Sequence, residues 1–130
     1  MRILIADDDV DDLELIEEAI HNTEPQAELH KVTGGKAIMK YLNEQRDEDL
    51  PCLIIIDYNM PEMNGAQVLQ QLNSKPRYQH IPKVMLSTSG GSLYKDECKN
   101  NGATAYFVKP NTLHELDTVA RKMLNFCSFQ

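Results

Sequence analysis

The sequence predicts an α/β fold in which five strands alternate with five helices, a (βα)5 chain that builds one doubly wound, five-stranded parallel sheet. Two observations favour it. Short apolar runs alternate along the chain with segments whose apolar residues recur at helical spacing. In addition, the run 52–56 is apolar throughout, which is typical of a central parallel strand covered by helices on both faces.

The individual elements follow in order along the chain. The predicted strands are 2–6, 28–32, 52–56, 83–87 and 104–108. The predicted helices are 10–22, 36–44, 65–72, 93–101 and 111–126. Asp9 is a candidate cap for the first helix, because an Asp side chain accepts hydrogen bonds from the first helical N–H groups. A chain of 130 residues without linkers or repeats has the usual length of one domain.

Composition excludes several classes of function. The formal charge is -7, from 20 acidic and 13 basic residues, which argues against nucleic acid as a partner. No apolar run approaches the roughly 20 residues that a membrane span requires, and the start of the chain lacks a signal-peptide layout. The cysteines Cys52, Cys98 and Cys127 are odd in number and lack metal-site spacing, so we expect free thiols in a reducing cytoplasm.

Polar side chains follow four of the predicted strands. Asp7 and Asp8 follow the first, Asp57 the third and Lys109 the fifth, while Ser87 ends the fourth. Ligands of open parallel sheets bind beyond the carboxyl ends of the strands, where these groups should converge. Clustered carboxylates call for a compensating cation, and Mg²⁺ prefers oxygen ligands. Lys109 and Ser87 suit a transferred phosphoryl group, and Asp57 is the candidate nucleophile.

Each of these residues also has a purely structural explanation. Asp7, Asp8 and Asp9 could form a solvated turn with a helix cap, and Asp57 could be a turn former before a Pro-Gly loop. Ser87 could be one of several loop hydroxyls, and Lys109 a surface lysine. Their joint occurrence at successive strand ends favours a functional site.

The order and spacing of these motifs resemble the response-regulator receivers of the CheY-like kind over essentially the whole chain. The resemblance rests on Asp7-Asp8, Asp57, Asn59-Met60-Pro61, Gly65, Ser87, Gly102-Ala103, Tyr106 and Lys109-Pro110. The run 81–89 is also similar to small stand-alone receivers associated with phytochrome kinases. The resemblance implies the flavodoxin-like strand order 2-1-3-4-5 and a receiver domain over 1–130 without an output domain.

The resemblance also implies roles for individual residues. Asp57 would be the phosphoacceptor, and Asp8 and Asp57 would bind Mg²⁺ directly. Asp7 would help, mostly through water, and the backbone carbonyl of Asn59 would be a further ligand. Lys109 would contact the phosphoryl group.

A cis peptide bond between Lys109 and Pro110 would help to aim the lysine in such a receiver. Ser87 and Tyr106 would form a switch pair, in which the hydroxyl moves toward the phosphate and the ring turns inward. The chain departs from the family pattern at Thr88, where a small residue is frequent and where the threonine could resist that turn.

The function expected from this resemblance is that of a stand-alone response regulator in a two-component phosphorelay. A sensor histidine kinase or histidine phosphotransfer protein would donate the phosphoryl group. The chain would not be a conventional enzyme, but would assist its own phosphorylation and dephosphorylation in the cytoplasm. The signal would leave by contact with an unidentified downstream protein, and the tail 126–129 after the last helix is a candidate docking or homodimer surface.

Two other readings stay open. Asp7 and Asp9 also resemble the nucleophile and the acid/base of haloacid-dehalogenase phosphohydrolases, although the chain lacks a cap region and Asp57 would then have no role. An inert binding module with the same fold is the second alternative.

Overall fold

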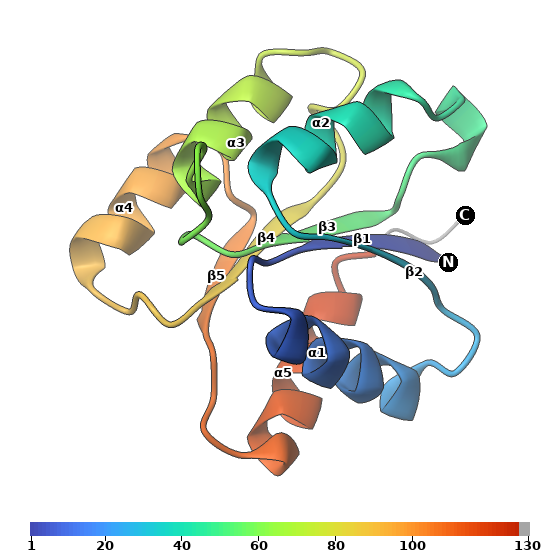
Figure 1. Ribbon diagram of the computed structural model, residues 1–130, viewed down its shortest axis with the longest axis vertical. Helices are drawn as coiled ribbons and strands as arrows, with labels where there is room; N and C mark the ends of the chain where they lie inside the picture. The colour runs from blue at the N-terminus through green and yellow to red at the C-terminus, as the bar shows by residue number, and fades with distance from the viewer. Residues whose placement is uncertain (128–130) are drawn as a thin grey trace.

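The strands of the computed structural model, which describes residues 1–127, form one parallel sheet (Figure 1). They are β1 (Arg2–Ala6), β2 (Glu28–Val32), β3 (Leu53–Ile56), β4 (Lys83–Ser87) and β5 (Ala105–Val108). Their spatial order is β2-β1-β3-β4-β5, and every neighbouring pair is parallel. The predicted fold class and strand order are therefore confirmed.

Five helices connect the strands. They are α1 (Val10–Thr23), α2 (Gly35–Asn43), α3 (Gly65–Asn73), α4 (Ser92–Asn100) and α5 (Leu113–Leu124), and a 3-10 turn, η1 (Asp47–Asp49), precedes β3. Most ends lie within a residue of the predicted ones, but α5 is shorter at both ends. It begins after Thr112, whose hydroxyl accepts a hydrogen bond from the Glu115 N–H and caps the helix. No helix within residues 1–127 is long and apolar enough to cross a membrane.

Alternating side chains of the central strands build two apolar cores. Ile3, Ile5 and Ile55 point to the face that α1 and α5 cover. Leu4 and Ile56 point to the opposite face, which α2, α3 and α4 cover (Figure 1). A strand that is buried on both faces needs no polar alternation, which explains the apolar runs of the sequence.

Two loops at the carboxyl edge of the sheet are set by local chemistry. The Asp9 side chain accepts hydrogen bonds from the N–H groups of Asp11 at 2.9 Å and Asp12 at 3.3 Å, so the predicted cap of α1 is confirmed. At the start of α3, a β-carbon on Gly65 would lie 2.8 Å from the backbone oxygen of Asp57. Only glycine lets α3 begin this close to the end of β3.

The expectation of free thiols is wrong for two of the three cysteines. Cys52, before β3, and Cys127, after α5, form a disulfide with their Cα atoms 5.0 Å apart. They are 75 residues apart in sequence, and residue spacing alone does not show which strand and helix ends meet. Cys98 is buried on α4 and carries a free thiol, as expected. Ser128 and Phe129 of the proposed docking tail lie outside the described residues.

Reduction of the Cys52–Cys127 bond should destabilise the chain. A cross-link that closes a loop of this length contributes about 4 kcal/mol in the chain-entropy model. We expect a dithiol reductant to lower the melting temperature by roughly 15 °C. The measurement is thermal unfolding by circular dichroism with and without reductant. The effect should disappear in Cys52→Ser and persist in Cys98→Ala; an equal effect in both variants would contradict the prediction.

Candidate functional site

Backbone pairing continues one residue beyond three of the strands and brings the predicted site residues to one edge. The N–H of Asp7 donates to the carbonyl of Val32 at 3.1 Å, and the N–H of Asp57 donates to the carbonyl of Ala6 at 3.0 Å. The N–H of Lys109 donates to the carbonyl of Ser87 at 2.9 Å. These residues therefore lie at positions fixed by the sheet rather than on free loops.

Three carboxylates meet at this edge. Asp7 and Asp57 are 1% and 4% exposed, whereas Asp8 is exposed, and each offers one oxygen within 4.8 Å of the other two. The Oδ1 atom of Asp7 accepts a hydrogen bond from the N–H of Asp9 at 2.9 Å. Its Oδ2 atom is buried and accepts no hydrogen bond from the described residues. A buried acceptor beside two further carboxylates suits a hard divalent cation such as Mg²⁺.

The charge on Asp7 is destabilised by its surroundings. The pKa of Asp7 is raised to about 6, with burial as the largest cause and the nearby charge of Asp57 acting in the same direction. Lys109 and the N–H of Asp9 act in the opposite direction without cancelling the effect of burial. The site would therefore favour additional positive charge.

Lys109 supplies the positive charge that is present. Its Nζ atom lies 2.6 Å from Asp7 Oδ2, 2.7 Å from Asp12 Oδ2 and 3.5 Å from Asp57 Oδ2. The contact with Asp7 is an ion pair between two largely buried side chains, which are 13% and 1% exposed. Burial alone would lower the pKa of Lys109, but its hydrogen bonds to carboxylates, with Asp12 first, raise it. The ammonium group therefore keeps its charge at neutral pH.

The peptide bond between Lys109 and Pro110 is trans, so the expected cis bond is a wrong prediction. The trans chain already places the lysine side chain among the carboxylates. Its position follows from the backbone hydrogen bond to Ser87 and from the ion pairs.

Asn59 lies beside the acceptor and ties two loops together. Its N–H donates to Asp57 Oδ1 at 3.3 Å, and its side-chain amide donates to the hydroxyl of Ser89 at 2.7 Å. The loop after β3 is thereby joined to the loop after β4. This contact holds Asn59 next to the cluster in which its backbone carbonyl is expected to act.

The residues of the expected switch pair share a partner. Ser87 is fully buried, and its hydroxyl accepts a hydrogen bond from the N–H of Ser89 at 3.2 Å. The Tyr106 hydroxyl donates to the backbone carbonyl of Ser89. Burial is the main cause that raises the pKa of Tyr106, so its hydroxyl keeps its proton at neutral pH. Both side chains therefore converge on the loop after β4.

Asp12 is a site residue that the sequence analysis missed. It lies in the first turn of α1, where it reads as one more acid on a solvent-facing side. Its contact with Lys109 depends on how α1 is rotated against the end of β5, which residue spacing does not specify. In the sequence, the only indication of this role is that Asp12 lies in the helix that begins beside the predicted site.

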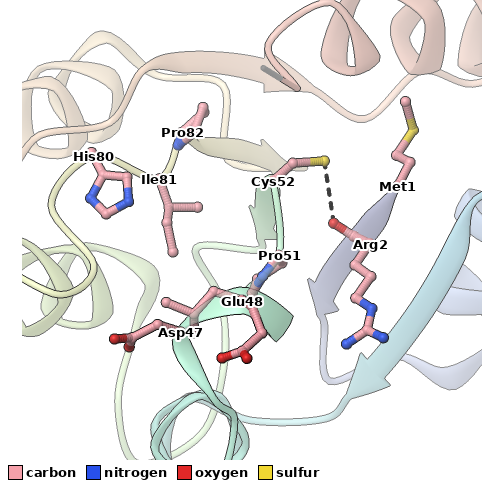
Figure 2. A pocket seen from close by; sticks show the side chains of 10 residues that line it. Met1, Arg2, Asp47, Glu48, Pro51, Cys52, His80, Ile81 and Pro82 are labelled. Atoms are coloured by element: carbon pink, nitrogen blue, oxygen red, sulfur yellow. Dashed lines mark hydrogen bonds between the residues drawn. The ribbon is translucent and has the colours of Figure 1, made fainter. Parts of the chain in front are cut away.

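A cavity of about 530 Å³ opens at the opposite edge, before the strands begin (Figure 2). It is lined by Met1, Arg2, Asp47, Glu48, Leu50, Pro51, Cys52, His80, Ile81 and Pro82. Cys52 Sγ lies 3.3 Å from the carbonyl oxygen of Arg2, a contact without a hydrogen bond because a disulfide sulfur carries no proton. Although the cavity is large, the convergent chemistry lies at the other end of the sheet.

Comparison with known proteins agrees with this geometry. The family model of the response regulator receiver domain matches residues 3–121, so the chain belongs to that family. The chain is 30% identical to chemotaxis protein CheY1 of Helicobacter pylori over 112 residues, which are 86% of this chain and 87% of that protein.

Solved structures agree as well. The phosphorylated cyanobacterial phytochrome response regulator RcpA has a TM-score of 0.87 and 29% identity, covering 97% of this chain and 92% of that one. The Mn²⁺-bound form of response regulator Rcp1 has a TM-score of 0.82 and 27% identity, covering 96% and 92%. The chain is therefore a CheY-like receiver of two-component signalling, a family whose members are generally not conventional enzymes.

Proposed function

We propose that this receiver accepts a phosphoryl group on Asp57 from a sensor histidine kinase or a histidine phosphotransfer protein and signals by contact with a downstream protein. The observation that carries the proposal is the position of Asp57. It is buried at a strand end, its oxygens lie among two further carboxylates, and Lys109 is nearby. A carboxylate that accepts a negatively charged phosphoryl group needs positive charge close by. The mobile ammonium group of Lys109 can supply it at this site.

The transfer itself requires little from the chain beyond position and charge. A carboxylate oxygen of Asp57 attacks the phosphorus atom of a phosphohistidine, and an O–P bond forms as the N–P bond breaks. The electron pair stays on the imidazole nitrogen, which takes up a proton. Attack by water on the same phosphorus later releases inorganic phosphate and restores the carboxylate. Lys109 is close enough to contact the phosphoryl oxygens, and the Ser87 hydroxyl is available as a further donor.

Mg²⁺ fits the acidic cluster as a cofactor. Asp8 and Asp57 would bind it directly, Asp7 would help mostly through water, and the backbone carbonyl of Asn59 would complete the protein ligands. The support is the carboxylate cluster itself, in which Asp7, Asp8 and Asp57 each offer one oxygen within 4.8 Å of the other two. When bound, the ion supplies positive charge against the carboxylates and the phosphoryl oxygens.

The phosphohydrolase alternative fits the site less well. It requires Asp7 as the nucleophile, but Lys109 Nζ lies 2.6 Å from Asp7 Oδ2 and 3.5 Å from Asp57 Oδ2, so Asp7 is the more tightly paired carboxylate. It also requires Asp9 as an acid/base, whereas the Asp9 carboxylate caps α1.

For the signal, we propose Ser87 and Tyr106 as the switch pair and α4, β5 and the start of α5 as the responding face. The contacts of α4 support this choice, because Cys98 is the only residue of α4 that is buried. Tyr58, next to Asp57, donates a hydrogen bond to Glu97 of α4 at 2.7 Å. A change at Asp57 can therefore reach α4 through the contact between Tyr58 and Glu97, and α4 has little buried surface to resist a shift.

This proposal predicts where phosphorylation alters the protein. Amide chemical shifts recorded with and without beryllofluoride, a phosphoryl mimic, should change along α4, β5 and the start of α5. Changes confined to the loops around Asp57, or spread evenly over the chain, would contradict the assignment of that face.

Loss of Asp57 should abolish phosphoryl uptake. Incubation with acetyl phosphate and Mg²⁺ should add one phosphoryl group to the wild type and none to Asp57→Asn, as measured by intact mass spectrometry. Asp9→Asn is the matched control, because Asn caps a helix as well as Asp and only the carboxylate is lost.

The control also separates the competing functions. The receiver should be phosphorylated normally in Asp9→Asn. Phosphoryl uptake by Asp57→Asn would show that another residue is the nucleophile and would overturn the proposal. Asp7 would then be the next candidate.

A further inference from the structure

Lys109 is held closer to the helix than to the phosphoacceptor. Its Nζ atom lies 2.7 Å from Asp12 Oδ2, a distance at which a charged hydrogen bond forms, but 3.5 Å from Asp57 Oδ2. The Oδ2 atom of Asp7 lies 2.6 Å from the same ammonium group. The cation is thus drawn to Asp12 and Asp7 and away from the oxygen that would carry the phosphoryl group.

The surroundings make the Asp12–Lys109 pair stronger than a solvent-exposed one. The Lys109 side chain is only 13% exposed and that of Asp12 is 32% exposed. Beside them is a small cavity of about 50 Å³ whose walls include Leu15, Leu86 and Leu116. Apolar walls lower the local dielectric constant, so the two charges attract each other more strongly than they would in water.

Asp12 is also fixed by the backbone. Its N–H donates to the Asp9 cap, and it lies in the first turn of α1, a helix that packs against α5. The carboxylate therefore belongs to a rigid element, whereas Lys109 is a long side chain that can move between partners.

We propose that Asp12 is a positioning residue for the phosphoryl reaction. In the resting chain it holds the Lys109 ammonium group off Asp57, and it competes with an incoming phosphoryl group for the same cation. The proposal rests on the proposed function, because it takes Asp57 as the acceptor. Asp12 is not among the motif residues on which the family resemblance rests.

Two consequences follow from the competition. The resting Asp57 keeps an oxygen that Lys109 contacts only weakly, so a donor phosphorus can approach it. When the phosphoryl group is in place, its oxygens must draw Lys109 away from Asp12. The free energy of the Asp12–Lys109 ion pair is then lost, and this loss weakens binding of the phosphoryl group. Removal of the Asp12 charge should therefore tighten the binding of a phosphoryl mimic.

The test compares Asp12→Asn with Asp11→Asn. Both substitutions remove one negative charge from the first turn of α1, so they alter net charge and the interaction with the helix dipole alike. Asp11 is exposed and, within residues 1–127, its carboxylate forms no ion pair. At saturating Mg²⁺, beryllofluoride should bind Asp12→Asn roughly three- to tenfold more tightly than Asp11→Asn.

A second measurement reports on Lys109 without metal or phosphoryl mimic. The side-chain ammonium signal of Lys109 in nitrogen-resolved NMR, assigned with Lys109→Arg, should shift in Asp12→Asn and stay unchanged in Asp11→Asn. An effect on folding alone would not select this one signal.

The outcomes separate the two proposals. If beryllofluoride binds the wild type and both variants have equal affinity, or Asp12→Asn binds more weakly, the role of Asp12 is overturned and Asp57 remains the acceptor. An unchanged Lys109 signal in Asp12→Asn would also overturn it. If beryllofluoride fails to bind even the wild type, the proposed function falls, and the role of Asp12 falls with it.

Discussion

The ion pairs of Lys109 with the carboxylates beyond the strand ends are the interaction on which the site depends. Backbone pairing forces Asp7 and Asp57 together in a buried place, where like charges repel strongly. Burial first, and the charge of Asp57 beside it, raise the pKa of Asp7 although one ammonium group lies in contact with it. A site with this surplus of negative charge is suited to bind a divalent cation.

The two ends of the sheet have separate tasks. At the carboxyl edge, the strand ends and the capped start of α1 hold charged groups in contact. At the amino edge, the Cys52–Cys127 disulfide joins the start of β3 to the end of α5. The apolar strands between the two edges hold the groups at each edge in position. Changes in the disulfide should therefore affect stability far more than they affect the charged site.

Much of this arrangement could be predicted from the sequence, because it depends on topology. Once the strands alternate with helices, Asp57 and Lys109 must lie at the same edge, whatever the details of packing. The Asp9 cap could be predicted for a different reason, because a cap is a local feature of the residues next to it. Cys98 was correctly expected to be free, in a helix with little else buried.

The features that were missed depend on three-dimensional detail. The role of Asp12 requires the rotation of α1 about its axis, and the disulfide requires the relative position of two chain segments that are 75 residues apart. The cis bond before Pro110 was expected from the resemblance alone, and no local residue pattern could test it. Residue spacing specifies neighbours along an element, but it does not specify which side chains meet across elements.

The central claim is that the carboxylates of Asp7, Asp8 and Asp57 form one divalent-cation site in the resting chain. The most direct test is the free energy of unfolding as a function of Mg²⁺ concentration, at constant ionic strength and without phosphoryl donor. A ligand that binds only the folded chain stabilises it by RT ln(1 + [L]/Kd). The account predicts a rise that follows this one-site curve and is lost in Asp57→Asn; no rise beyond that caused by Na⁺ at equal ionic strength would contradict it.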